Sequence, residues 1–140
     1  MTFGLEVKIF RALTDALDIF ASNASLSLAK PGIGFTPSSG TPYLKVAFLP
    51  GSTEALDVAG DVNEYLGTFQ ASVFYPEGAG IVLAMETAAS LAAAFESGTA
   101  LSHGGISFRI LAPPHIGPAL EEPGWVMLPV SIRYRAFLTS

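Results

Sequence analysis

The two histidines are the first residues to consider for chemistry, because histidine most often carries acid–base catalysis at neutral pH. His103 precedes two glycines in an expected turn, and His115 follows a double proline in an expected loop. A catalytic or metal-binding pair would need a carboxylate that converges on both, and no HExxH spacing is present. We therefore interpret both as ordinary exposed histidines.

Other catalytic and cofactor motifs are incomplete. Gly78-Ala79-Gly80 precedes an expected helix, as in a phosphate-binding turn, but Leu83 occupies the third glycine position of the dinucleotide fingerprint. The chain has no P-loop, no GxSxG nucleophile elbow and no cysteine, which excludes disulfides, zinc ribbons and thiol catalysis. The sequence predicts no enzymatic activity, no cofactor and no metal site.

Charged residues are unevenly distributed along the chain. The segment 51–64 has no basic residue and is expected to be an exposed acidic loop. Its carboxylates do not follow the order of an EF-hand calcium-binding loop. They are Glu54, Asp57, Asp61 and Glu64. Four of the seven basic residues fall on the outward phase of expected strands: Lys45, Arg109, Arg133 and Arg135. If these strands are neighbours, the bases form a stripe on the sheet face away from the helices.

The acidic segment and the basic stripe are complementary but different surfaces. Pairing them between copies of the chain gives a head-to-tail contact, which closes into a ring when the rotation allows. We therefore expect these eight residues to form a subunit or partner interface. The alternative is a solvated sheet face with no partner.

Two helices must position these surfaces. Residues 6–21 place apolar side chains on one helical stripe, with Lys8, Arg11, Asp15 and Asp18 opposite. A second helix is expected from about 81 to 95, where one face contains Ile81, Ala84, Met85, Ala88, Leu91, Ala92 and Phe95. The reverse face of this second helix has a single charge, Glu86, which is few for a helix that faces water.

The strands account for most of the remaining chain. Alternation predicts strands at 25–29, 43–49, 65–75 and 125–138, with the second ended by Pro50-Gly51, and a hairpin of 99–102 with 106–111. The proline- and glycine-rich stretch 30–42 is expected to be a loop. This order predicts an α+β fold in which two helices pack on one face of a mostly antiparallel sheet, as a single domain over residues 1–140.

Composition restricts the class of protein further. Of the 140 residues, 50% are hydrophobic and only 14% are charged, and the formal net charge is −5, which excludes a disordered tail and a basic nucleic-acid module. No run of about 20 apolar residues predicts a membrane span, and residues 1–8 do not resemble a secretory signal, so we expect a soluble protein made in a cytoplasm. The excess apolar surface is expected to pack against other protein.

The chain resembles the small tail-terminator-like proteins (minor tail or head–tail joining proteins) of siphophages and prophages. The resemblance lies in the order and spacing of the N-terminal helix and of residues 40–50, 67–80, 117–119, 125 and 129–135. It implies a subunit of a hexameric ring that caps the tail tube, stops tube polymerisation and provides the head-joining surface. It implies no cofactor and no chemistry.

The implied partners are other copies of the chain, the tail tube protein and a head-completion or connector protein. Contact with DNA in the ring lumen would be transient and non-specific, which agrees with the negative net charge. The implied location is the virion tail or neck, after assembly in the bacterial host cytoplasm. Two alternatives stay open: another ring protein of the neck, and a small-ligand-binding or enzymatic domain with a pocket lined by Tyr65, Tyr75 and Trp125.

Overall fold

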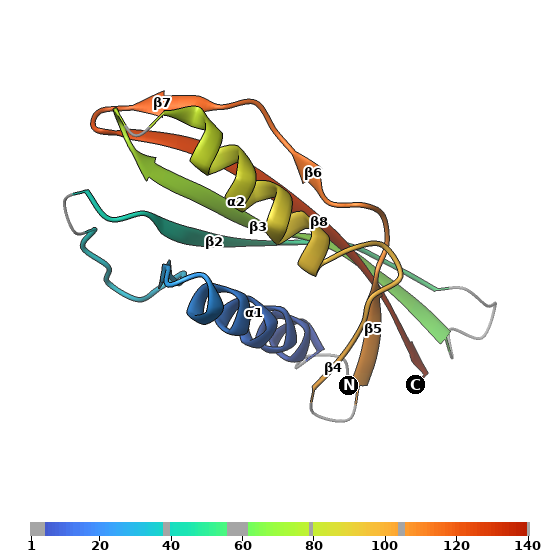
Figure 1. Ribbon diagram of the computed structural model, residues 1–140. Coiled ribbons are helices and arrows are strands. Elements are labelled where there is room, and N and C mark those ends of the chain that lie inside the picture. Colours follow the sequence, from blue (N-terminus) through green and yellow to red (C-terminus); the bar gives the residue numbers. More distant parts are fainter. Residues whose placement is uncertain (1–4, 38–39, 56–61, 79, 104–105, 140) are drawn as a thin grey trace.

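The computed structural model describes residues 5–37, 40–55, 62–78, 80–103 and 106–139 (Figure 1). Within these residues, two helices and eight strands follow one another. They are α1 (Leu5–Asn23), β1 (Ser27–Ala29), β2 (Tyr43–Ala55), β3 (Val62–Pro76), α2 (Ile81–Ala94), β4 (Ala100–His103), β5 (Ile106–Ile110), β6 (His115–Ile116), β7 (Leu120–Glu122) and β8 (Trp125–Thr139).

All strands belong to one sheet, in the order β1-β2-β3-β8-β5-β4, with β6 and β7 also paired to β8. Every pairing is antiparallel except that of β1 with β2. Because β3 pairs with β8 over its whole length, β5, β6 and β7 must all lie along the other edge of β8. The predicted α+β fold with a mostly antiparallel sheet is confirmed.

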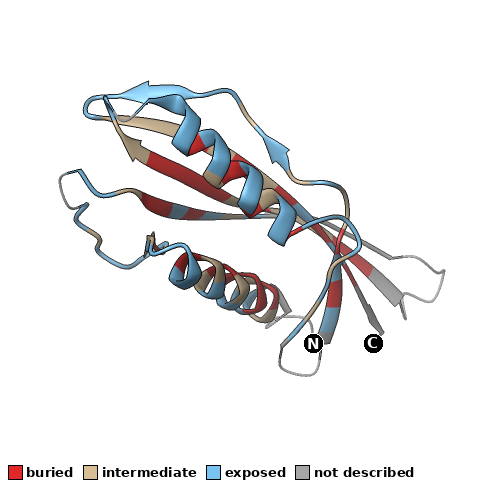
Figure 2. Ribbon diagram, in the orientation of Figure 1, coloured by how far each residue is buried: buried red, intermediate tan, exposed pale blue. Residues whose placement is uncertain are grey.

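Both helices bury apolar side chains in one hydrophobic cluster with the inner face of the sheet (Figure 2). The stripe predicted for the first helix is confirmed, because Ile9, Leu13 and Leu17 are fully buried in α1. The sheet contributes alternate residues of its long strands, among them Phe69, Ala71, Val73, Val130, Ile132 and Tyr134. The opposite phase of these strands forms the outer face of the sheet.

The buried side of α2 is narrower than the sequence predicts. Only Ala84, Ala88, Leu91 and the adjoining Phe95 are buried, whereas Ile81 and Met85 are 43% and 53% exposed. A helix that is apolar on most sides gives no sharp signal for which side faces the sheet. Two residues assigned to the core by their helical phase therefore lie on the surface.

The expected end of a strand at Pro50-Gly51 is wrong. The expected acidic loop is wrong for residues 51–55 and 62–64, which belong to strands, while residues 56–61 lie outside the described residues. Strand β2 continues to Ala55 with a register irregularity between Pro50 and Thr53, and β3 begins at Val62. Proline is tolerated here because β1 pairs only with residues 43–45, which leaves this part of β2 without a ladder partner on its other side. The two strands therefore form a long hairpin arm in place of the loop.

Two short strands were not expected from the sequence. Both β6 and β7 pair with β8, through His115 with Ser131 and through Leu120 with Met127. Their two and three residues are too few to show any alternation of apolar and polar side chains.

Neither helix in the described part of the chain is long and apolar enough to cross a membrane.

Candidate functional site

The strand register shows where the predicted basic stripe lies. Arg133 and Arg135 are exposed and alternate with the buried Ile132, Tyr134 and Ala136, so they occupy the outer face of the sheet. In the neighbouring strand, Arg109 is the direct partner of Arg135. These three arginines therefore form one group on β5 and β8, which we call the arginine cluster.

Lys45 lies on the same face but away from the arginine cluster. It pairs with Ser72 in β3, and Ser72 pairs with Pro129 in β8, four residues before Arg133. Four residues of a strand span about 13 Å, and Lys45 is also two strands away from β8. The structure thus brings three of the four predicted bases together and leaves Lys45 apart.

The structure departs further from the prediction for the acidic residues than for the basic ones. Glu64 is a buried residue of β3, and its carboxylate forms an ion pair with Arg135. The distance from Oε2 of Glu64 to Nε of Arg135 is 2.6 Å. The expectation that Glu64 belongs to an exposed loop is therefore wrong, because the carboxylate is paired within its own chain. Glu54 lies opposite Glu64 in the register, while Asp57 and Asp61 lie outside the described residues.

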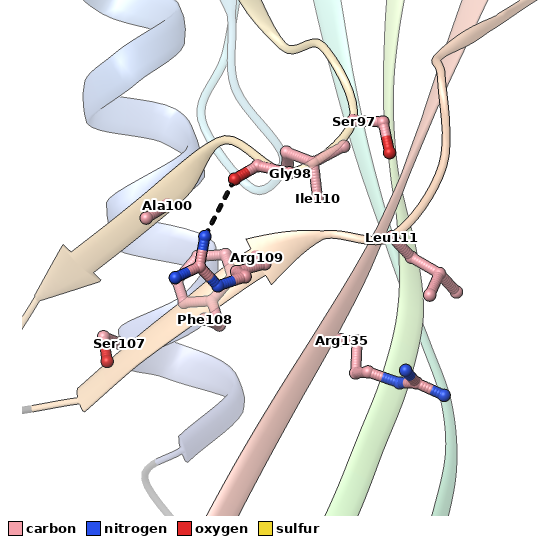
Figure 3. A pocket seen from close by; sticks show the side chains of 9 residues that line it. All are labelled: Ser97, Gly98, Ala100, Ser107, Phe108, Arg109, Ile110, Leu111 and Arg135. Atoms are coloured by element: carbon pink, nitrogen blue, oxygen red, sulfur yellow. Dashed lines mark hydrogen bonds between the residues drawn. The ribbon is translucent and has the colours of Figure 1, made fainter.

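A cleft of about 510 Å³ opens beside the arginine cluster (Figure 3). Arg109 folds back and donates a 3.0 Å hydrogen bond from a guanidinium nitrogen to the carbonyl of Gly98, whereas Arg135 projects away from it (Figure 3). The remaining lining is small or apolar, including Ser97, Ala100, Ser107 and Leu111. The cleft offers guanidinium groups to an anionic surface but no nucleophile–base pair.

The Glu64–Arg135 ion pair is expected to stabilise the subunit. Replacing Glu64 by glutamine keeps the shape but removes the charge, which we expect to lower the free energy of unfolding by about 1–2 kcal/mol, since Arg135 is partly exposed and screened. Urea denaturation followed by circular dichroism measures this. The matched change Glu86→Gln, on exposed helix surface, should cost less than about 0.5 kcal/mol. Equal stability of the two variants would contradict a stabilising ion pair.

A second apolar cluster covers the other end of the outer face. Tyr43 stacks on Phe74 with ring centroids 4.6 Å apart and meets Trp125 edge-on at 5.1 Å. Burial first, and the nearby Glu122 carboxylate second, raise the pKa of the Tyr43 hydroxyl above its usual value. Tyr43 shares the outer face of β2 with Lys45, and its aromatic partners Phe74 and Trp125 come from strands whose register the sequence does not show.

The pocket suggested for the ligand-binding alternative does not form. Tyr65 and Tyr75 are ten residues apart in β3, which is about 33 Å of extended strand. Tyr75 exchanges a 2.6 Å hydrogen bond with Thr87 of α2, while Trp125 belongs to the outer aromatic cluster. The three aromatic residues therefore cannot line one cavity.

The histidines stand on separate strands. His103 ends β4, and His115 begins β6, where it is exposed. Among the described residues, no group of three or more histidine, aspartate or glutamate side chains is placed to hold a metal ion. The geometry of the described part thus offers charged and apolar surfaces as the strongest candidates for function.

Comparison with known families decides the class. The family model for the phage tail terminator protein matches residues 8–134, which is nearly the whole described fold. The chain belongs to the phage tail terminator family. The resemblance noted in the sequence is therefore confirmed, and the chain is a phage tail or neck structural protein by family.

Solved structures agree with this terminator fold. One solved chain is 30% identical in sequence and superposes with a TM-score of 0.76. The alignment covers 91% of this chain and 92% of the solved chain. A chain in the virion of a native gene transfer agent particle is 18% identical, matches 95% of this chain and 94% of its own, and has a TM-score of 0.57. At that identity the second similarity shows the fold alone. A comparison with curated proteins gave no match.

The sequence located one candidate surface of this terminator only in part, because the weakly charged reverse face of helix 81–95 fits a buried subunit face. Ile81 and Met85 lie on the side of α2 that borders β7, and Val82 is exposed next to Ile81. The nearby β6 and β7 expose Ile116 and Leu120. The signal was present in the nearly uncharged helix 81–95, but its phase was assigned to the core. Five large apolar side chains on one side of a small subunit indicate a protein contact.

Proposed function

We propose that this protein is a ring-forming tail terminator, which caps the phage tail tube, stops its polymerisation and provides the surface that joins the head. The observation that carries the proposal is the family match over residues 8–134. The absence of a built nucleophile–base or metal constellation in the described residues is compatible with work done by shape and association. The virion particle that shares the fold supports a place in an assembled particle.

The proposed assembly is a homo-oligomeric ring of six subunits in the tail or neck of the virion, formed in the bacterial host cytoplasm. Its other partners are the tail tube protein and a head-completion or connector protein. DNA passes the lumen with only transient, non-specific contact, because a chain with net charge −5 has little capacity to hold phosphates. Another ring protein of the neck is the second candidate, which the match to a terminator model disfavours.

The arginine cluster is the proposed electrostatic contact of this ring. Arg135 is already bound to Glu64 of its own chain, so the bases that face a neighbour are Arg109 and Arg133. The proposed complementary residues of the next copy are the other carboxylates of segment 51–64, namely Glu54, Asp57 and Asp61, of which the last two lie outside the described residues. Because the two surfaces differ, the contact is head-to-tail and compatible with ring closure.

Charge reversal at Arg133 tests this contact. Arg133→Glu should weaken self-association at low salt at least tenfold and make it less responsive to salt, because an attractive pair becomes a repulsive one. Light scattering coupled to size-exclusion chromatography, repeated over a range of ionic strengths, measures the effect. The double reversal of Arg133 and Arg135 is less suitable, since it would also leave Glu64 beside a second carboxylate.

The matched control is Arg133→Lys, which keeps the positive charge at the same position of the outer sheet face. It should assemble like the unmodified protein. If Arg133→Glu also assembles normally at every ionic strength, the arginine cluster is only a solvated surface and the proposed contact is wrong.

A further inference from the structure

The side of the subunit that carries α2, β6 and β7 is both apolar and acidic; we call it the α2 flank. Its exposed apolar side chains are Ile81, Val82, Met85, Ile116 and Leu120. A hollow of about 580 Å³ lies among them, lined by Ile81, Leu120 and Val126 together with the carboxylates Glu77 and Glu121. Glu122 adjoins Glu121 in β7, and no lysine or arginine lines the hollow.

This flank is directed away from α1. The other exposed side of α2 borders a separate groove, where Leu83, Glu86 and Ser90 face Phe20 and Ala24 at the end of α1. Ile81 instead lines the hollow with β7, and Figure 1 shows β6 and β7 along the margin of the molecule opposite α1. The α2 flank is therefore one outer margin of the subunit.

The opposite margin is apolar and carries both positive and negative side chains; we call it the α1 flank. Val7, Arg11 and Asp18 share one side of α1, because their spacings of four and seven residues return to the same helical phase. A 3.1 Å ion pair between Asp18 and Lys30 shows that this side faces the loop after β1. In that loop Ile33 is 65% exposed, and on the helix Val7 is 53% exposed.

The charges on the two flanks decide which surfaces meet. Two α2 flanks packed on each other would oppose like charges, which costs affinity. On the α1 flank Lys30 is paired with Asp18, and Arg11 adds a further positive charge beside the apolar side chains, so this flank does not repel the carboxylates of the α2 flank. The Ile33 loop leads into β2 at Tyr43, which is in register with Phe74, Met127 and then Leu120 of β7. Ile33 and the hollow thus belong to the same end of the sheet.

We infer that the α2 flank of one copy packs against the α1 flank of the next, with the Ile33 loop over the hollow between α2 and β7. The inference rests on the proposed ring and names its apolar contact. Opposite margins of one subunit make a head-to-tail interface, which closes into a ring.

Two charge insertions test the contact from both sides. Val82→Glu places a carboxylate in the apolar part of the α2 flank, and Ile33→Glu places one opposite Glu77 and Glu121. Each variant alone should associate at least tenfold more weakly than the unmodified protein in light-scattering and sedimentation measurements. The matched control is Leu83→Glu, which has the same helix and similar exposure but faces the α1 groove, and it should assemble normally.

Mixing the two variants distinguishes the possible interfaces. Each variant keeps one intact flank, so an equimolar mixture should form a one-to-one dimer that cannot extend into a ring. If Val82→Glu forms rings like the unmodified protein, the inference is wrong while the ring stands, and a selective loss of tail-tube binding would assign the α2 flank to the tube protein. If Ile33→Glu forms rings and Val82→Glu does not, the α2 flank packs against a surface other than the α1 flank, and the inference is also wrong. An unmodified protein that stays monomeric with and without tail tubes would overturn both the ring and this contact.

Discussion

Replacing Phe95 by alanine should lower the free energy of unfolding by about 3–5 kcal/mol, the usual cost of deleting a fully buried aromatic ring. The residue is 1% exposed and follows directly after α2. The other buried residues of this helix are Ala84, Ala88 and Leu91, so Phe95 is one of only two large side chains that α2 inserts into the core. Thermal denaturation followed by circular dichroism should show a midpoint roughly 10 °C lower.

The control for Phe95 is Met85, which is 53% exposed on the α2 flank. Met85→Ala should change the free energy of unfolding by less than about 0.5 kcal/mol, while weakening self-association because it shortens an apolar side chain of the proposed contact. A loss below 1 kcal/mol for Phe95→Ala would show that α2 is not held by its last turn. The two variants therefore separate the stability of the subunit from its assembly.

Replacing Gly67 by alanine is expected to lower the free energy of unfolding by about 2–3 kcal/mol, through overpacking. Gly67 pairs with Tyr134 across β3 and β8, and the Tyr134 ring lies over the glycine where a Cβ atom would stand. Tyr134 is 1% exposed and stacks on Phe48 at 5.8 Å, so its ring has no free space to move into. Urea denaturation of the purified variant measures the cost.

Two variants make the Gly67 prediction specific. Gly34→Ala adds the same methyl group where no heavy atom lies within 4 Å, and it should cost less than about 0.5 kcal/mol. In the background of Tyr134→Leu, which removes the overlying ring, adding Gly67→Ala should cost little further. An undiminished cost in that background would place the strain elsewhere than in the Gly67–Tyr134 pair.

Long periodic segments made most of this fold predictable from the sequence. The stripe of α1 and the alternation around Phe69 and Ile132 both report burial on one side, and the structure confirms those sides. The continuation of β2 through Pro50 could not be predicted, because it depends on that stretch having no strand on its outer side. The short β6 and β7 likewise depend on the open edge of β8, a property of the assembled sheet and not of their own residues.

The candidate site was predictable only in part, because alternation within a strand is visible in the sequence whereas strand order and register are not. Alternation places Arg133 and Arg135 on the outer face correctly, but only strand order shows that Arg109 joins them and that Lys45 does not. The Glu64–Arg135 pair depends on the register of β3 with β8, which local patterns do not fix. The exposed side of α2 was misplaced because alanine-rich helices show weak amphipathicity.

The central claim is that this chain acts as a terminator by forming a ring on the tail tube. The most direct measurement is negative-stain imaging of tail tubes polymerised from purified tube protein with and without this protein at increasing ratios. A ring-forming terminator should give ring-shaped density at one end of each tube, and tube lengths should stop increasing once the protein is added. Tubes that keep growing at the same rate, with no density at their ends, would contradict it.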